Sequence, residues 1–338
     1  MVLIIALIKI VAVLLVMLTT VAYTVLLERK LAAAMQNRIG PNRVGWNGFL
    51  QPLADVIKLV MKEDIVPRNA NRFVHDLAPI ISISVALVTF AVIPFGNQIT
   101  IFGNEIKLQI ASVNVGILYI LALASLGVYG VTLSGWSSNN KYSLIGGMRS
   151  SAQMISYELS MGLSVIGVVM MTGTVELDRI VTAQAGWHWN FLLQPIGFIT
   201  FVIASFAETN RVPFDLPEAE PELVGGYHTE YSGLKFGLFF LAEYANMLTA
   251  SALITTLYLG GWQIPFITTF GLSPFVVSLL QVGSFCVKVF LMLVFFILIR
   301  WTIPRFRYDQ LMFLGWNVML PLSLANILLT GAFLLFFQ

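Results

Sequence analysis

The sequence contains a single cysteine, Cys286, among 338 residues. A disulfide within the chain is therefore impossible, and a zinc site or an iron–sulfur cluster held by several cysteines is excluded. The only histidines, His75, His188 and His228, do not form the paired intramembrane ligands that haem requires. The sequence also has no P-loop, no dinucleotide fingerprint and no nucleophile beside a base. We therefore expect this chain alone to have no catalytic centre, no metal site and no bound cofactor.

Charged residues are scarce as well. They make up 11% of the sequence against 58% hydrophobic residues, and the net charge is only +2. Such a chain lacks the polar surface of a soluble protein, and it has no run of Lys and Arg that would bind nucleic acid. It has instead a series of apolar runs of about 20 residues or more, the length that crosses a bilayer as a helix. The first run is too long for a signal-peptide core, so we interpret it as a retained helix.

The predicted fold is an all-α integral membrane protein in which residues 1–338 form a single membrane domain. The eight predicted spans are residues 2–27, 73–96, 113–134, 150–172, 189–207, 236–259, 275–299 and 313–337. Apolar residues recur at helical spacing between residues 49 and 61, with Asp55 and Lys58 on the opposite side. This pattern predicts an amphipathic helix that lies on the membrane surface.

The basic residues indicate an orientation. The four odd-numbered loops hold 15 of the 19 Lys and Arg residues, whereas the even-numbered loops hold only Lys107 and Arg179. Because basic loops stay on the inner side of a membrane, both termini are predicted on the outer side. The odd-numbered loops are then expected to face the cytoplasm, or the matrix in a mitochondrion.

Three ionisable residues lie deep in the predicted spans: Glu158, Glu243 and Lys288. A charged side chain at the bilayer centre costs about 2.5 kcal/mol or more, so such residues are usually functional. Two acids and a base at this depth predict a polar path, in which Lys288 is a candidate counter-charge. Tyr157 and Tyr244 adjoin the two glutamates and are candidates to extend the path. A neutral hydrogen bond between helices is the structural alternative for Glu158.

A long acidic loop, residues 208–235, follows the fifth span and has only Arg211 and Lys235 as basic residues. Its six carboxylates are Glu208, Asp215, Glu218, Glu220, Glu222 and Glu230. Prolines fix an irregular backbone, and apolar residues such as Phe214 favour burial over a solvated loop. Crowded carboxylates in a partly dry setting do not all ionise, so some are expected to bind protons near neutral pH. Metal binding is the alternative, but His228 adds no ligand pattern to the cluster.

Basic residues gather in two further segments on the same side. ERKLAAAMQNRIGPNRVG, which starts at Glu28, contains Arg29 and Arg38 and makes a turn at Gly40 and Pro41. RWTIPRFRYDQL contains Arg300, Arg305 and Arg307. Anchoring at the membrane surface explains some of these residues. Their number beside turns also favours docking of an acidic partner or a polar head group.

These segments resemble a membrane subunit family of the proton-pumping NADH:quinone oxidoreductase, respiratory complex I: the H subunit, known as subunit 1 in mitochondria. The resemblance covers essentially the whole chain and rests on ERK…QNRIGPNRVG, GWSSNNKY…R…AQMISYE, AETNRVPFDLPEAEPELVGGYHTEYSG…AEY and PRFRYDQLM. One departure is Asn317 after Trp316, where the family usually has Trp-Lys.

The resemblance implies eight membrane helices at the junction with the peripheral arm, in the bacterial cytoplasmic membrane or the mitochondrial inner membrane. The subunit would form the entrance and lower wall of the quinone chamber. Quinone would be a substrate shared with the peripheral subunits, which hold the clusters and the residues that contact its head group. The other expected partners are small membrane subunits, antiporter-like subunits and lipids, and no nucleic acid is expected.

Two groups of site residues follow from the resemblance and the charges together. The proton-coupling group is Glu158, Glu208, Asp215, Glu218, Glu220, Glu222, Glu230 and Glu243, with Lys288. The chamber and interface group is Glu28, Arg29, Arg38, Gly40, Pro41, Lys141, Arg149, Arg211, Phe214, Arg300 and Arg305.

Two other functions compete with this one. A membrane anchor subunit of a membrane-bound hydrogenase, or of another relative of complex I, shares the helices and an acidic loop but need not bind quinone. The nearly unbroken acidic segment favours the complex I subunit. An independent secondary transporter would have inverted repeats or broken helices in matched halves, and the sequence shows neither.

Overall fold

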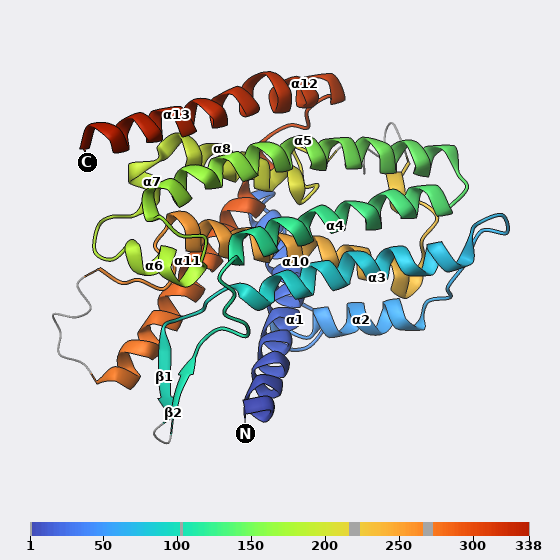
Figure 1. Ribbon diagram of the computed structural model, residues 1–338. Coiled ribbons are helices and arrows are strands. Elements are labelled where there is room, and N and C mark those ends of the chain that lie inside the picture. Colours follow the sequence, from blue (N-terminus) through green and yellow to red (C-terminus); the bar gives the residue numbers. More distant parts are fainter. Residues whose placement is uncertain (1, 102–103, 216–223, 266–272, 338) are drawn as a thin grey trace.

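The computed structural model describes residues 2–101, 104–215, 224–265 and 273–337, and most of its secondary structure is helical (Figure 1). The carboxylates Glu218, Glu220 and Glu222 of the acidic loop lie outside the described residues. The long helices are α1 (Val2–Met35), α3 (Arg72–Thr89), α4 (Gly116–Ser137), α5 (Lys141–Thr172), α10 (Gly233–Tyr258), α11 (Pro274–Thr302) and α13 (Leu320–Phe337). The shorter helices are α2 (Gln51–Met61), α6 (Leu177–Ala183), α7 (Asn190–Leu193), α8 (Pro195–Glu208) and α12 (Tyr308–Phe313). The described residues also contain the short 3₁₀ turns η1 (Trp46–Gly48), η2 (Phe90–Val92) and η3 (Gly226–His228), and the π-helical segment η5 (Leu314–Met319).

Seven helices of the described chain are long and apolar enough to cross a bilayer, which confirms the prediction of a helical, multi-pass membrane protein. They are Ala6–Met35, Arg72–Val92, Gly116–Ser137, Lys141–Thr172, Gly233–Tyr258, Pro274–Thr302 and Tyr308–Phe336. Outward-facing apolar side chains such as Leu7 and Leu328 are more than half exposed, as expected for a surface that faces lipid.

The predicted fifth span, residues 189–207, is interrupted. Gln194 separates α7 from α8 with a non-helical backbone (φ −133°, ψ 64°), because a residue before a proline disfavours helical angles and Pro195 follows. The Gln194 side-chain amide donates to the Gly167 carbonyl at 2.7 Å, so it has a partner inside the bundle. The 14 residues of α8 reach roughly 21 Å, less than the thickness of the hydrocarbon core. The count of eight spans therefore stays a prediction.

Two helix ends differ most from the prediction. α1 continues to Met35 instead of ending at residue 27, and α5 begins at Lys141 instead of residue 150. Arg29 and Arg149 are therefore helical residues and not loop residues. Basic residues are good helix formers whose long stems cover apolar surface, so charge alone does not mark a helix end. The start of α5 is set by Asn140, whose side chain accepts a hydrogen bond from the Tyr142 backbone at 3.0 Å.

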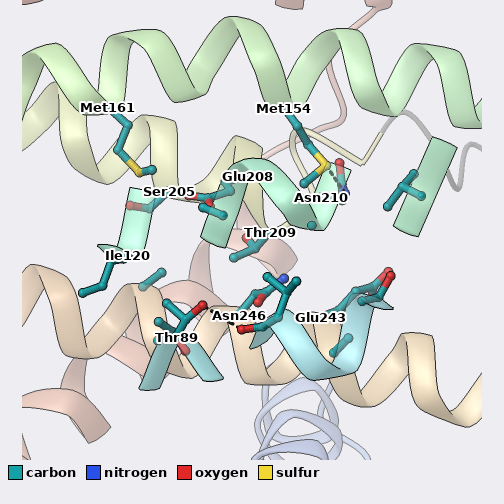
Figure 2. Close-up of a pocket in the computed structure, with 18 of the residues that line it drawn as sticks. Thr89, Ile120, Met154, Met161, Ser205, Glu208, Thr209, Asn210, Glu243 and Asn246 are labelled. Atoms are coloured by element: carbon teal, nitrogen blue, oxygen red, sulfur yellow. Dashed lines mark hydrogen bonds between the residues drawn. The ribbon is translucent and has the colours of Figure 1, made fainter. Parts of the chain in front are cut away.

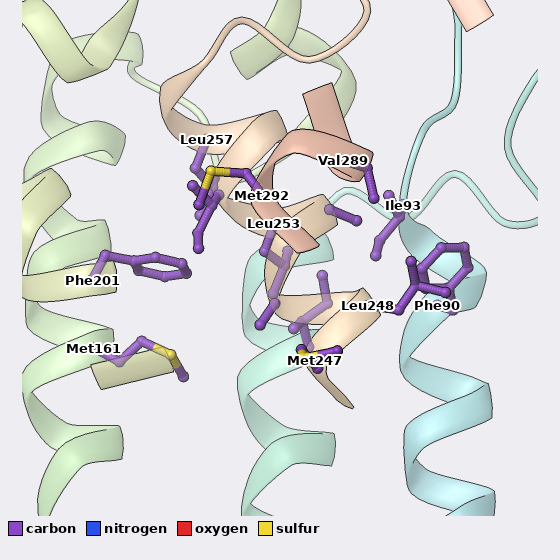
Figure 3. Close-up of a cluster of buried hydrophobic side chains, with 14 of the residues drawn as sticks. Phe90, Ile93, Met161, Phe201, Met247, Leu248, Leu253, Leu257, Val289 and Met292 are labelled. Carbon is purple, nitrogen blue, oxygen red and sulfur yellow. The ribbon is translucent and has the colours of Figure 1, made fainter. Parts of the chain in front are cut away.

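In the view of Figure 1, α3, α4 and α5 lie side by side and nearly parallel, while α1 crosses them steeply. Small residues allow the close approach of α3 and α4. A Cβ atom at Gly130 of α4 would lie 2.2 Å from the Ser82 hydroxyl oxygen of α3. The largest hydrophobic core joins α10 to the helices around it (Figure 3). Figure 3 shows Phe201 of α8, Leu253 of α10 and Met292 of α11 in this core.

The structure also contains a hairpin that the sequence analysis did not predict. β1 (Gln98–Ile101) and β2 (Asn104–Lys107) pair antiparallel, with Gln98 opposite Lys107. The Ser278 hydroxyl on α11 donates to the Gln98 carbonyl at 2.7 Å, which fastens the hairpin to the bundle. The strands have four residues each, too few for alternation to stand out within an apolar sequence.

The predicted helix near residues 49–61 is present as α2. Val56, Val60 and Met61 are each more than half exposed, and Asp55 pairs with Arg29 of α1 at 2.7 Å. The helix and its amphipathic character thus agree with the prediction. Its position on a membrane surface stays a prediction.

Candidate functional site

A buried ion cluster is centred on Glu28, which is 5% exposed on α1. One carboxylate oxygen accepts a hydrogen bond from Arg300 of α11. The other accepts from Arg211 at 3.3 Å and from the Tyr244 hydroxyl of α10 at 2.7 Å. Three distant parts of the chain therefore meet at one carboxylate.

Arg211 extends the cluster to a second carboxylate. Its guanidinium lies 4.0 Å from Glu243 of α10 and 3.9 Å above the centre of the Tyr244 ring. The Tyr227 hydroxyl donates to the same Glu243 carboxylate at 2.9 Å. Arg211 is only 4% exposed, and a buried guanidinium is stable only when carboxylates and ring faces surround it. The cluster is thus a charge-balanced unit that links α1, α10 and α11.

The turn that carries Arg211 is held by polar residues of α5. Asn210 has a left-handed φ of 49°, which asparagine tolerates better than most residues. The Gln153 amide donates to the Ala207 carbonyl at 2.8 Å and to the Phe214 carbonyl at 2.7 Å, one on each side of Arg211. The Ser150 hydroxyl donates to the Asn210 side chain at 3.2 Å. These bonds fix the position of Arg211 against the bundle.

A cavity of about 60 Å³ lies beside the cluster among α3, α4, α5, α8 and α10, and most of its lining is apolar. We call it the polar cavity after the carboxylates and amides in its wall. Glu208 at the end of α8 and Glu243 both line it, together with Asn246 and Thr89. Figure 2 shows Glu208 on one side of the cavity and Glu243 on the other. A buried water needs roughly 10–15 Å³, so this cavity has room for a few ordered waters. The structure thus places two carboxylates in the wall of one small cavity.

Glu158 lies on α5 near the same cavity, and Met154 and Met161, one turn to either side, line it. Its carboxylate accepts a hydrogen bond from the Ser125 hydroxyl of α4. The structural alternative, a hydrogen bond between helices, is therefore present. It does not exclude titration, because serine donates to a carboxylate and also accepts from a carboxylic acid.

The beginning of the acidic loop is well ordered on the bundle. Asp215 is 3% exposed and pairs with Arg305 at 3.0 Å. Phe214 packs against Tyr157 and Phe306, with ring centres 5.5 and 5.6 Å away. Phe214 is therefore buried, as predicted.

Tyr157 makes a structural contact with α12, and its part in a polar path stays a prediction. Its hydroxyl donates to the Leu311 carbonyl at 2.9 Å. In a regular α-helix that carbonyl would accept from Gly315, where the π-helical turn η5 occurs. Tyr157 therefore serves the packing of η5 on α5.

Lys288 does not approach either intramembrane glutamate. Its ammonium donates to the carbonyls of Leu259, Gly261 and Gln263, each at 2.9 Å, and lies 4.7 Å from the Trp189 ring centre. Carbonyls at the C-terminal end of a helix lack partners and attract cations. The ammonium group of Lys288, a residue of α11, thus lies beside the C-terminal end of α10. The expectation that Lys288 is a counter-charge to Glu158 or Glu243 has no geometric support.

The acidic residue Glu230 lies at another edge of the protein. It accepts a hydrogen bond from the Asn140 amide at 2.6 Å, and it lines an open groove with Arg68 and Lys141. Its neighbour Tyr231 stacks on His75, with ring centres 3.9 Å apart. Burial raises the pKa of Tyr231 to about 12. Glu230 is therefore separate from the Glu28 cluster.

The other predicted basic residues are spread over the same end of the bundle. Arg29 pairs with Asp55 of α2, as described above, and Arg38 donates to the Gln36 amide oxygen at 2.6 Å. Arg149 lies over the Tyr308 ring at 5.5 Å. Of the predicted chamber residues, Glu28, Arg211 and Arg300 converge on one cluster. Arg29, Arg38 and Arg149 do not belong to it.

Three residues that the sequence analysis did not single out support the site. They are Ser125, which donates to Glu158, Tyr227, which donates to Glu243, and Gln153, which holds the Arg211 turn. In the sequence, the one feature that could have marked these residues is a polar side chain within an apolar segment. That signal is weak, because serine and threonine commonly bond to their own helix.

The fold and the buried charges define a class: a multi-pass helical membrane protein built around a charge cluster and a polar cavity. Within this class, the chain belongs to the NADH dehydrogenase family, since the model of that family matches residues 8–331.

Several curated relatives are similar over nearly their whole length. The H 1 subunit of NADH-quinone oxidoreductase from Cytophaga hutchinsonii is 52% identical over 93% of this chain and 92% of its own. The H 2 subunit of the same enzyme from Geobacter sulfurreducens is 53% identical over 97% and 96% of the two chains. NADH-quinone oxidoreductase subunit 8 of Rhodothermus marinus is 52% identical over 93% and 92%. The chain is accordingly a membrane subunit of an oxidoreductase complex of the respiratory chain, and other subunits of that complex are its partners.

Proposed function

We propose that this subunit forms the entrance and lower wall of a quinone chamber and couples quinone reduction to proton translocation through its buried carboxylates. The observation that carries the coupling is the position of Arg211 between Glu28 and Glu243. Glu243 also lines the polar cavity with Glu208. A change of charge on the Glu28 side of Arg211 therefore alters the electrostatic potential at Glu243, whose carboxylate faces the cavity.

The segment between α1 and α2 supports the chamber entrance. Ile39 is 81% exposed and Trp46 is 93% exposed, so apolar side chains lie open on both sides of the turn at Gly40 and Pro41 in the chain. A quinone tail is apolar and arrives within the membrane, and its head group needs polar partners. The basic residues Arg29 and Arg38 lie close to this turn in the chain and offer such partners.

Gly40→Trp is expected to weaken quinone reduction more than electron entry from NADH. A Cβ atom at Gly40 would lie 3.3 Å from the Ala33 Cβ and from the Lys30 Cα, so a large side chain must project away from α1. NADH oxidation would be measured with quinone and with ferricyanide as acceptors in the assembled complex. Phe73→Trp, at an exposed position on α3 outside this segment, is the control. Equal losses with both acceptors would show that the turn matters for assembly alone.

The path into the membrane would continue from the cavity to Glu158. The carboxylates Glu208 and Glu243 share the cavity, and the cavity reaches the two methionines that flank Glu158. Ordered waters in the cavity would transfer protons between these carboxylates. The proposed orientation has both termini on the outer side, so the Glu28 cluster lies toward the inner side.

Glu158→Gln is expected to lower proton translocation while the complex still assembles, because glutamine keeps the size of the side chain and removes its proton. Ser125→Ala is expected to have a smaller effect, since one hydrogen bond contributes about 1 kcal/mol. Thr132→Ala is the control, because the Thr132 hydroxyl lies 2.6 Å from that of Ser151 between the same helices without a carboxylate. Formation of a pH gradient in proteoliposomes is the measurement. Full translocation by an assembled Glu158→Gln complex would make Glu158 a structural residue.

A membrane anchor that does not bind quinone is the second candidate. The relatives described above are named as subunits of NADH-quinone oxidoreductase, which favours the first candidate. Quinone-dependent NADH oxidation by the purified complex distinguishes the two.

A further inference from the structure

A narrow apolar groove of about 520 Å³ runs along the outer surface between α1 and α11. Val16 and Met17 of α1 form one wall, and Phe285 and Val289 of α11 form the other. Leu248 of α10 lies at its base, and Figure 3 shows Leu248 and Val289 in the adjoining core. The groove shares no described residue with the polar cavity and is therefore a separate feature.

The length and lining of the groove suit hydrocarbon chains. On α1 the groove extends from Ala12 to Thr20, which is roughly 12 Å at the helical rise. Apart from Thr20, the described residues that line it are apolar or, at Cys286, a thiol. An acyl chain in this groove would therefore contact almost only apolar side chains.

One end of the groove is basic. Lys9 lies one turn before Ala12 and Val13, on the groove side of α1. Its ammonium donates to the Lys107 carbonyl at 2.8 Å and to the Gln109 carbonyl at 3.3 Å, and Leu108 between these two residues lines the groove. No carboxylate of the described chain forms a salt bridge with Lys9. The positive charge at this end therefore has room for an external anion.

We propose that this groove binds one anionic phospholipid, with its acyl chains between α1 and α11 and its phosphate at Lys9. The apolar walls match hydrocarbon and the basic end matches a phosphate. A neutral isoprenoid tail would fill the walls but would gain nothing from the charge of Lys9. This proposal does not depend on the proposed quinone chamber.

The sole cysteine of the chain reports on the groove, because Cys286 is exposed and lines it. The purified complex would be stripped of lipid and then supplied with phosphatidylglycerol or phosphatidylcholine. Alkylation of Cys286 by an apolar maleimide would be followed by mass spectrometry of its peptide. Phosphatidylglycerol is expected to slow alkylation several-fold more than phosphatidylcholine, and the substitution Lys9→Gln should remove that difference. Lys58→Gln, at an exposed position on α2, is the control.

Retained lipid gives a second measurement. Cys286→Phe should reduce the phospholipid that stays with the washed complex, because the ring occupies the groove. Val287→Phe is the matched control, since Val287 is 59% exposed and does not line the groove. NADH oxidation would confirm that both complexes are assembled. Slow alkylation in stripped complex would assign the groove to a protein partner, and protection by added quinone but not by phospholipid would assign it to an isoprenoid tail. Either result, or equal lipid in the two variants, would overturn the proposal.

Discussion

Arg211→Met is expected to destabilise the subunit by about 3–5 kcal/mol, the cost of removing one partner from a buried ion pair. The substitution removes the cation that lies between Glu28 and Glu243 and leaves both carboxylates in a dry setting. Less assembled complex and a lower dissociation temperature should result, together with loss of most NADH:quinone activity. Thermal scans of the purified complex and activity assays measure the two effects.

Arg179→Met is the control for that experiment. Arg179 also pairs with a glutamate, Glu176, at 2.8 Å, but its side chain is 73% exposed. Exposed pairs contribute roughly 0–1 kcal/mol, so this variant should behave almost as the wild type. If the two variants had the same small effect, the Glu28 cluster would not be a stabilising unit. Arg211→Met combined with Glu28→Gln should be less unstable than Arg211→Met alone, because one buried negative charge is removed as well.

Glu243→Gln is expected to lower the rate of NADH:quinone reduction by about 100-fold or more, since positioned acid–base groups typically contribute that much. The amide keeps the size of the side chain and a partner for the Tyr227 hydroxyl, but it holds no transferable proton. The rate of NADH:ferricyanide reduction should not change, because that reaction does not use the cavity. Glu176→Gln, at a glutamate away from the cavity, is the control. An unchanged quinone rate in assembled Glu243→Gln complex would remove Glu243 from the path.

The helices and the intramembrane carboxylates were predictable from the sequence. Long apolar runs have no alternative but to cross the membrane as helices, and Glu158 and Glu243 stand out because ionisable residues are costly there. The break before α8 was visible in principle, since Gln194 and Pro195 interrupt the fifth run. The break was not predicted, because the apolar run as a whole has about the length of one membrane-spanning helix.

The central position of Glu28 was not predictable in the same way. Its partners Arg211 and Arg300 are 183 and 272 residues away in the chain, and no local pattern connects them. Lys288 shows the opposite case. Its charge stood out in the sequence, but its partners are backbone carbonyls, which carry no residue identity. A lone intramembrane charge therefore predicts that a partner exists and not which partner it is.

On the proposed mechanism, protons pass through the cavity shared by Glu208 and Glu243 when quinone is reduced. The most direct measurement is the number of protons translocated per NADH oxidised by Glu208→Gln/Glu243→Gln complex in proteoliposomes. Assembly would be verified by subunit composition and by NADH:ferricyanide activity. We expect intact ferricyanide reduction, strongly reduced quinone turnover and almost no pH gradient. Wild-type quinone turnover with the wild-type number of protons per NADH would contradict it.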